Sequence, residues 1–204
     1  MAKFESTHMP STFKESEIPV ARQILAPEDC FLVVIDIQEK LLPPIFNKEL
    51  LVRNSQLLIR LANLLHIPVL ATTQYAARLG STIPEIASLF NGTVTHDKLE
   101  FSCFGSEAFC ADMKSLPANR NTVLVCGMEA HICVTQTVLS ALNRGYLVHV
   151  PADALGSRTE ANWNIGLRRM EAAGAVISST EMMMYELMRA SGTPVFKEML
   201  KHLK

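Results

Sequence analysis

The sequence predicts an α/β protein, a three-layer α/β/α sandwich around a mainly parallel central sheet. Continuous apolar runs rich in β-branched residues recur along the chain, as expected of strands buried on both faces. Segments with helical periodicity separate these runs, and such alternation is typical of a parallel sheet covered by helices on both sides. Hydrophobic residues make up 49% and charged residues 19% of the 204 residues, which is ordinary for a folded globular protein.

The predicted strands are apolar runs without the polar alternation of a half-exposed sheet. Buried parallel strands have this continuous character, because helices cover both of their faces. Four runs are strong and a fifth is weaker, and in chain order they are Phe31–Asp36, Pro68–Thr73, Asn121–Gly127, Tyr146–Asp153 and the weaker Ala175–Ser179.

The predicted helices lie between these runs. Leucines three and four residues apart place an apolar stripe on Asn47–His66, and Pro68 prevents its continuation. A second stripe follows Cys133 and ends at Gly145. Two later helices are predicted to begin at a threonine with a glutamate nearby, and they are Thr159–Ala173 and Thr180–Met188.

The segment Gln74–Asp112 departs from this alternation. It contains several turn residues, a short strand-like piece at 92–96 and a polar and aromatic stretch, KLEFSCF. Loops on a rigid sheet commonly carry binding residues, so this segment is predicted to form the wall of a site. By loop position, the predicted pocket residues are Gln38, Gln74, Tyr75, Phe101 and Phe104.

Residues 1–28 are predicted to form an N-terminal arm, followed by a single domain over 29–204. The arm is polar, contains three prolines and has no secretory-type apolar segment, although organelle targeting by it stays open. No apolar run in the chain approaches the 18 residues of a membrane span. The prediction is therefore a cytoplasmic protein without a membrane partner.

Charge and cysteine content narrow the partners and cofactors. A net charge of -1 provides no general attraction for nucleic acid, so a nucleic-acid partner is not expected. Five cysteines are an odd number and indicate reduced intracellular thiols. Their C-x6-C spacings do not match zinc sites, so no metal or other cofactor is predicted.

Asp36 and Lys98 are candidate charged groups of an active site. Asp36 ends the first predicted strand, where partial removal from water suits a general base, although an Asp that caps the next turn is equally consistent. Lys98 lies in a predicted loop and reads by itself as a solvated lysine. Beside an Asp–Cys pair, however, its charge would orient the carboxylate and stabilise a thiolate.

Cys133 is the candidate nucleophile. It stands six residues after Gly127, where the strand 121–127 gives way to a helix, and a helix start favours the thiolate. A buried structural thiol is the alternative, since free cysteines are often buried. His131 is two residues away, too poorly placed on a helix for a direct dyad, and is predicted to line the pocket or to be structural.

Together these residues resemble the cysteine hydrolases of the isochorismatase-like superfamily. The matching motifs are Asp36-Ile37-Gln38, Lys98 in a mid-chain loop and GMEAHIC at 127–133, and the resemblance extends from about Cys30 to about Tyr185. TTQY at 72–75, ADALGSR at 152–158 and the C-terminal FKEMLK look most like the isochorismatase domain-containing subgroup. The implied fold is the isochorismatase-like, Rossmann-like sandwich.

The resemblance implies a catalytic triad and a reaction. Asp36 would take the thiol proton, Lys98 would orient the carboxylate, and Cys133 would attack a small amide or ureide-like carbonyl to form a thioester that water hydrolyses. The family also has a non-proline cis peptide that would fall at Met128–Glu129 here. The N–H groups of Glu129 and Cys133 would then form an oxyanion hole.

Two departures from related enzymes narrow the range of activities that the resemblance implies. ATTQYAARLG at 71–80 lacks the Asp-x-His metal motif of nicotinamidases, and true isochorismatases lack the nucleophilic cysteine. Both activities are therefore disfavoured. The main alternative is a catalytically weak or inert family member that serves as an oligomeric binding module.

A homo-oligomer is expected in either case. Apolar helical faces in Glu181–Met188 and in the tail PVFKEMLKHLK provide more surface than one core needs, although these helices also fit a packing onto their own sheet. Small molecules are the predicted substrates.

Overall fold

The computed structural model describes residues 24–203, so most of the predicted N-terminal arm lies outside the described residues. Its centre is a seven-stranded sheet with the order β3-β2-β1-β4-β5-β7, and β6 pairs with β4. All the strand pairs are parallel, which confirms the predicted fold class. In chain order the strands are β1 (Cys30–Ile35), β2 (Val69–Gln74), β3 (Thr95–Lys98), β4 (Thr122–Met128), β5 (Leu147–Pro151), β6 (Leu155–Gly156) and β7 (Val176–Ser178).

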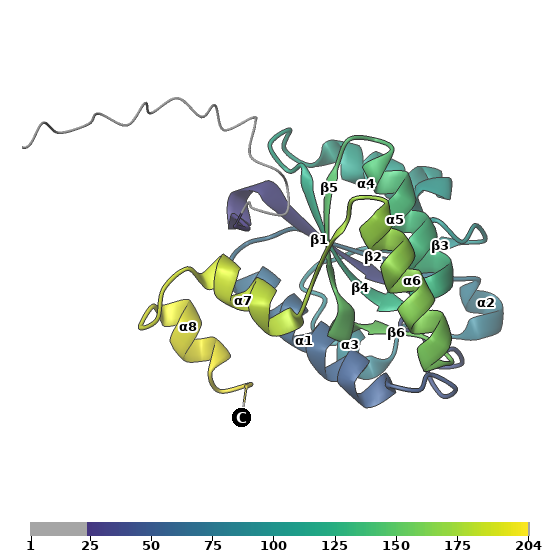
Figure 1. The fold of residues 1–204 in the computed structure, drawn as a ribbon, viewed down its shortest axis with the longest axis horizontal. Helices are drawn as coiled ribbons and strands as arrows, with labels where there is room; N and C mark the ends of the chain where they lie inside the picture. Colours follow the sequence, from purple (N-terminus) through teal and green to yellow (C-terminus); the bar gives the residue numbers. More distant parts are fainter. Residues whose placement is uncertain (1–23, 204) are drawn as a thin grey trace, which may run out of the picture.

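Helices cover both faces of this sheet (Figure 1). One layer holds α1 (Lys48–Leu64), the single-turn α3 (Pro84–Ala87), α7 (Thr180–Met188) and α8 (Pro194–Met199). The other layer holds α4 (Glu107–Ser115), α5 (Thr135–Leu142) and α6 (Glu160–Ala172). The short helix α2 (Ala76–Leu79) follows β2 at the edge of the molecule.

The two faces of β1 explain why its sequence is apolar without interruption. All six of its residues are buried. Leu32 and Val34 belong to the hydrophobic cluster under α1, whereas Phe31, Val33 and Ile35 belong to the cluster under α5. Successive side chains of a strand point to opposite faces, so a strand between two helix layers needs an apolar residue at every position.

The long segment after β2 is more ordered than predicted. It contains α2, α3, β3, α4 and a 3-10 turn, η4 (Cys103–Gly105). The strand-like piece predicted at 92–96 is displaced, because β3 covers Thr95–Lys98 and pairs with β2. Little in the sequence indicates this strand, because β3 is a short edge strand and all four of its residues are polar.

The predicted helices agree with α1, α5, α6 and α7, with small differences at their ends. Thr159 caps α6 by accepting a hydrogen bond from the Asn162 N–H at 3.2 Å. Helix α7 covers Thr180–Met188, as predicted, and the Ser179 hydroxyl caps it. Serine and threonine hydroxyls both accept from the free N–H groups of a first turn, so either residue is a useful sequence signal for a helix start.

Residues 24–28 of the predicted arm contact the body of the protein. Leu25 is buried, and its N–H donates to the Glu186 carboxylate at 3.1 Å. The guanidinium of Arg120 bonds to the carbonyl oxygens of Pro27 and Cys30. The chain is therefore held to the domain before β1 begins.

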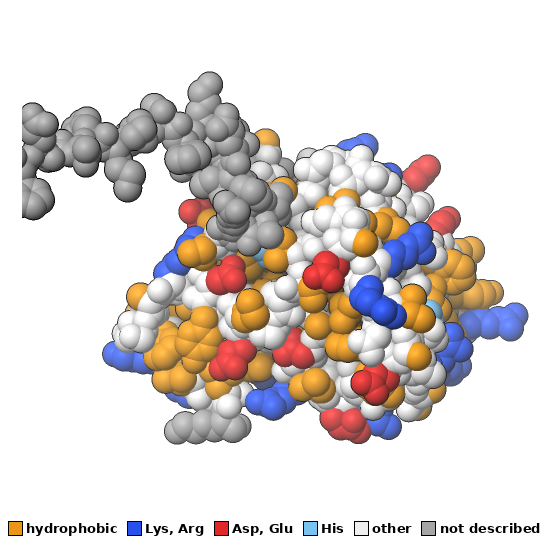
Figure 2. Space-filling model, viewed as in Figure 1, with side chains coloured by type: hydrophobic (Ala, Val, Ile, Leu, Met, Phe, Trp, Pro, Cys, Tyr) orange, Lys and Arg blue, Asp and Glu red, His pale blue; other side chains and the backbone are white. Residues whose placement is uncertain are grey.

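The methionine-rich helix α7 is mostly an interior element. Met183, Met184 and Met188 are buried in the cluster under α1, while Met182 and Tyr185 stay exposed. Figure 2 shows apolar side chains over α7 and α8 on one face, next to acidic and basic groups. The predicted homo-oligomer remains a prediction. Between residues 24 and 203, no helix is both long and apolar enough to cross a membrane.

Candidate active site

The candidate residues meet at the carboxyl ends of four neighbouring strands. Asp36 follows β1, Gln74 ends β2, Lys98 ends β3, and Cys133 lies five residues after β4. The sheet order β3-β2-β1-β4 makes these strand ends neighbours in space, and Gln74 pairs directly with Lys98 in the ladder. In parallel α/β sheets, this edge is where sites form.

A buried ion pair joins Asp36 and Lys98. The Lys98 Nζ lies 2.7 Å from the Asp36 Oδ2, and both side chains are 0% exposed. The Thr72 hydroxyl donates to the other carboxylate oxygen, Oδ1, at 2.8 Å. Isolated buried charges are very unfavourable, so each ion depends on the other and on these hydrogen bonds.

The backbone conformation of Asp36 directs its carboxylate into this site. Its φ of +52° lies in the left-handed region, which aspartate tolerates better than most residues. Its N–H donates to the Thr72 carbonyl at 3.1 Å. Asp36 is therefore fixed by its main chain as well as by its side chain.

Lys98 belongs to strand β3, so its predicted loop position is wrong. Within β3 the residues alternate between exposed and buried, and Lys98 is a buried member of that pattern. Its long aliphatic stem suits the strand interior, while the ammonium at its tip reaches Asp36.

Gln74 connects the ion pair to the thiol. Its Oε1 accepts a hydrogen bond from Lys98 Nζ at 2.8 Å and lies 3.9 Å from the Cys133 Sγ, which donates to it. The sequence placed Gln74 in the pocket wall by loop position, and the structure places it at the end of β2 with these two polar contacts.

Cys133 lies in a π-helical turn, η5 (Ala130–Val134), that precedes α5. The Thr135 hydroxyl donates to the Ala130 carbonyl at 2.6 Å and so supports the wide turn. Wide turns of this kind occur frequently at functional sites. The thiol is buried, with 6% of the residue exposed.

The expected bias of Cys133 toward thiolate is wrong for the resting protein. Burial raises the pKa of the Cys133 thiol, the negative charge of Asp36 raises it further, and the charge of Lys98 only partly opposes them. Cys133 does lie at the start of a helical segment, as predicted, because η5 runs directly into α5, but burial and Asp36 outweigh the effect of that position. The resting thiol is therefore protonated.

Two glycines bring the elements of the site together. Gly127, with φ of +129°, pairs with Ile35, and a Cβ on it would lie 2.1 Å from the Ile35 carbonyl oxygen. A Cβ on Gly166 of α6 would lie 3.0 Å from the Ala130 carbonyl oxygen of η5. Only glycine permits the first of these approaches, directly before the turn that carries Cys133.

The residues before Cys133 have defined partners. The Met128–Glu129 peptide is cis, as the resemblance implied. The Glu129 carboxylate accepts from the backbone N–H and the Nε of Arg158, both at 3.0 Å. The His131 Nδ1 lies 3.1 Å from the Ser157 Oγ. His131 is thus held by a serine hydroxyl.

The other predicted pocket residues divide into three environments. Gln38 is fully buried, and its amide bonds to the backbone of Gln74 and of Gly80. Phe104 is 9% exposed and packs on Phe109 and under Arg144, within the helix layer. Tyr75 and Phe101 are exposed, by 42% and 53%.

Sequence reasoning missed Thr72 and Cys103. Thr72 donates to Asp36, and its Oγ1 also lies 3.6 Å from the Cys103 Sγ. Burial chiefly raises the pKa of Cys103, to about 11, and Asp36 adds to this effect. Thr72 pairs with Ile35 in the ladder, so the strand register was the signal that would have placed it beside Asp36.

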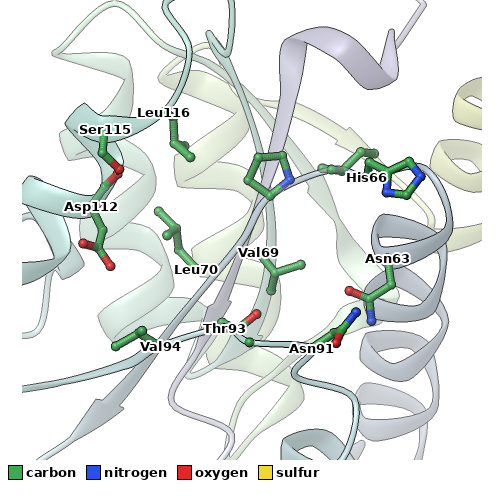
Figure 3. A pocket seen from close by; sticks show the side chains of 13 residues that line it. Asn63, His66, Val69, Leu70, Asn91, Thr93, Val94, Asp112, Ser115 and Leu116 are labelled. Atoms are coloured by element: carbon green, nitrogen blue, oxygen red, sulfur yellow. The ribbon is translucent and has the colours of Figure 1, made fainter.

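A cavity lies at the opposite edge of the sheet, where the strands begin. It has a volume of about 440 Å³ and opens near the first residues of β2, with Asp112 and Ser115 of α4 on one side and Asn63 and His66 on the other (Figure 3). Among residues 24–203, no group of three or more His, Cys, Asp or Glu side chains is arranged to hold a metal ion.

The parallel sheet, with an Asp–Lys–Cys cluster at its carboxyl edge, defines an isochorismatase-like α/β protein. A family profile described as Isochorismatase domain matches residues 30–182, and the chain belongs to this family. This agrees with the resemblance read from the motifs.

Relatives and solved structures support the assignment over most of the chain. The chain is 37% identical over 183 residues to the secreted isochorismatase effector Isc1 of Phytophthora sojae. This match covers 88% of this chain and 87% of the relative. It is 35% identical to the mouse isochorismatase domain-containing protein 2B over 178 residues, 87% and 82% of the two chains. The solved MAR1 ribonuclease from Caenorhabditis elegans is 33% identical, with a TM-score of 0.82 over 89% of this chain and 92% of that one.

Proposed function

We propose that the protein is a cysteine-dependent hydrolase that cleaves a C–N bond of a small amide or ureide-like molecule. The observation that carries this proposal is the fully buried Asp36–Lys98 ion pair beside the Cys133 thiol. Structural ion pairs are mostly exposed, and a buried pair next to a nucleophile is an arrangement suited to moving a proton.

In the first step, Asp36 acts as the general base. The pair begins as carboxylate and protonated thiol, which agrees with the raised pKa of Cys133. As the sulfur attacks the carbonyl carbon, its proton passes to Asp36, and the charge that develops on the substrate oxygen is stabilised by the N–H groups of Glu129 and Cys133. Lys98 keeps its positive charge throughout and holds the carboxylate in place.

In the second step, Asp36 returns the proton to the leaving nitrogen. The C–N bond breaks, an amine or ammonia departs, and the acyl group remains on Cys133 as a thioester. Water then attacks the thioester while Asp36 accepts a proton from it. The carboxylic acid product leaves, the sulfur regains the proton, and the enzyme returns to its starting state.

The experiment is a hydrolysis assay with the intact chain against small amides, ureides and esters. Wild type is compared with Cys133→Ala, Asp36→Asn and the control Cys110→Ser, which changes another thiol on α4. Mass spectrometry follows an acyl group on the Cys133 peptide. Turnover and an adduct that both disappear in Cys133→Ala are expected, whereas turnover that survives this change would overturn the proposal.

A second candidate is a binding module with little turnover. It is favoured by the enclosure of the reactive groups, since Asp36 and Lys98 are buried and only 6% of Cys133 is exposed. A protein that binds panel compounds, measured by a rise in melting temperature, but forms no adduct and releases no product would fit this candidate. The homo-oligomer is part of it, and light scattering tests that state directly.

The names of relatives suggest one more substrate for the panel. The Caenorhabditis elegans protein is called a ribonuclease, so a short RNA is included. The net charge of -1 offers no general attraction for a polyanion, and we expect no cleavage. Similarly, the cytoplasmic location stays a prediction, because the Phytophthora sojae relative is named as secreted.

A further inference from the structure

The Gln74 side chain touches both partners of the proposed chemistry. One oxygen, Oε1, is 2.8 Å from Lys98 Nζ and 3.9 Å from Cys133 Sγ. An ammonium group carries three N–H donors, and the two acceptors contacted by Lys98 are Asp36 and Gln74. These two contacts fix the direction of the ammonium group.

The orientation of the amide is set by its surroundings. Its Nε2 donates to the Leu99 carbonyl at 2.7 Å, which leaves the oxygen facing Lys98 and Cys133. The Gln74 N–H donates to the Gln38 Oε1 at 2.6 Å, and the Gln38 Nε2 donates back to the Gln74 carbonyl at 3.1 Å. Only one amide orientation satisfies this network, because a flipped amide would place donors against the ammonium.

We infer that Gln74 is a positioning residue that holds the Lys98 ammonium and the protonated Cys133 thiol on a single amide oxygen. The inference rests on the proposed function and adds a fourth side chain to it. In the resting state the oxygen accepts from both groups. When the thiol loses its proton, its bond to Gln74 is lost, and the attraction between sulfur and ammonium remains.

Replacing the neutral amide of Gln74 by an apolar or a charged group should therefore change how readily the Cys133 thiol loses its proton. The other titratable groups that act on Cys133 are Asp36 and Lys98, with a smaller contribution from Cys103 on η4. His131 lies on the same turn as Cys133 and bonds to Ser157. A change confined to Gln74 leaves all of these groups in place.

The test measures alkylation of Cys133 by iodoacetamide between pH 7 and 10, read on the Cys133 peptide by mass spectrometry. Gln74→Met removes the acceptor at similar length, and Gln74→Glu keeps an acceptor but adds a negative charge. The matched controls are Gln56→Met and Gln56→Glu on α1, where the Gln56 amide donates to the Glu85 carbonyl, far from the Cys133 network. Thermal melting confirms that each variant is folded.

The two changes are expected to act in opposite directions. Gln74→Met should speed alkylation by about 3- to 10-fold, because the protonated thiol loses an acceptor. Gln74→Glu should slow it by about 10-fold or more, because a carboxylate opposes formation of a second negative charge. If Gln74→Met does not fold, Gln74→Glu alone still tests whether the alkylation rate falls as expected. Rates that change less than twofold, or in the same direction, would overturn the inference.

This result is separable from the proposed function. Alkylation needs no substrate, so the two tests can fail independently. If the alkylation rates of Gln74→Met and Gln74→Glu change in opposite directions but hydrolysis persists in Cys133→Ala, the hydrolase proposal is contradicted and the role of Gln74 is supported. Conversely, Cys133-dependent hydrolysis without these shifts would sink only the role of Gln74. On a substrate found by the panel, Gln74→Met should lower kcat by about 10-fold or more with KM little changed.

Discussion

The two edges of the central sheet differ in what they offer a ligand. At the carboxyl edge, charged and nucleophilic groups converge, and the side chains of Asp36 and Lys98 are completely buried. At the amino edge, a cavity of about 440 Å³ is open, and its polar lining includes Asn63, Asp112 and Ser115. The carboxyl edge thus gathers reactive side chains, whereas the amino edge offers open volume.

The difference teaches that volume and reactivity are separate indicators of a site. A pocket supplies space, but catalysis needs groups that exchange protons at close range. The amino-edge cavity has one paired titratable group, Asp112, which lies 2.9 Å from His96. The carboxyl edge has a carboxylate, a cation and a thiol within one network. Five predictions separate these two edges.

The largest effect is expected from Cys133→Ser. On any substrate that the wild type hydrolyses, kcat/KM should fall by about 10³-fold or more, because serine is a far weaker nucleophile at this position. The measurement is steady-state kinetics with melting curves as a control for folding. If Cys133→Ser kept a tenth of the wild-type activity, the functional site would have to lie elsewhere than at the carboxyl edge.

Next comes Lys98→Met, which removes one partner of the buried ion pair. The Asp36 charge would stay buried without compensation, and the free energy of unfolding should fall by about 3–5 kcal/mol. Urea denaturation measures this loss. The double variant with Asp36→Asn should recover part of it, because the unpaired charge is gone. A loss below about 1 kcal/mol in the single variant would show that the pair does not hold this edge together.

Gly127→Ala tests the close approach of β4 to β1. The new Cβ would meet the Ile35 carbonyl oxygen, and crowding of this kind costs about 1–3 kcal/mol or more in unfolding free energy. Gly145→Ala is the control, since its φ of +84° is also positive but no atom lies within 4 Å of the new Cβ. If both variants lost the same unfolding free energy, the cause would be the positive φ of the backbone and not the contact with β1.

A smaller effect is expected from raising the pH, which should lower the stability through each buried thiol. Burial is the main cause that raises the pKa of Cys30 and of Cys126, each to about 12, and the pKa of Cys133 is raised as well. Below about pH 8.5 these thiols are protonated in both states, so the stabilisation is complete there. Above it the unfolded chain loses protons first, and stability should fall by up to about 1.4 kcal/mol per pH unit for each thiol.

Denaturation between pH 8 and 10 checks this slope. The Cys133→Ala variant should lose stability less steeply than the wild type, since one raised thiol is absent. A stability that rises with pH over this range would contradict the sign. The comparison also separates the thiol of the carboxyl edge from Cys30 and Cys126 in the interior of the sheet.

The smallest effect is expected at the amino edge. Ser115→Ala removes an exposed hydroxyl that donates to the Asp112 carbonyl, and stability should change by no more than about 0.5 kcal/mol. Hydrolysis should be unchanged. If this variant instead lost activity comparable to Cys133→Ser, the open cavity would be part of the functional site.

Much of the fold could be predicted because its strands are buried on both faces. A run such as Cys30–Ile35 has no polar position, and few other structures produce that pattern. The edge strand β3 was misplaced because all four of its residues are polar and therefore resemble a loop. The fold was therefore most predictable at the centre of the sheet and least predictable at its edge.

The site was predictable residue by residue but not as a network. Motifs identified Asp36, Lys98 and Cys133, whereas the contacts of Thr72 and Gln74 depend on the strand register that pairs Ile35 with Thr72 and Gln74 with Lys98. The ionisation of Cys133 was predicted in the wrong direction. Local position suggested a helix start, while burial and the charge of Asp36 prevail in the folded protein.

The position of β1 has a consequence for synthesis on the ribosome. Its neighbour β4 comes late in the chain, since Cys30 pairs with Thr122, and at typical translation rates this delay is roughly 5–20 s. During that time one edge of an entirely apolar strand has no partner, and such edges invite aggregation. The nascent chain should therefore depend on chaperones until β4 emerges, and codon choice before residue 122 becomes a factor in its yield.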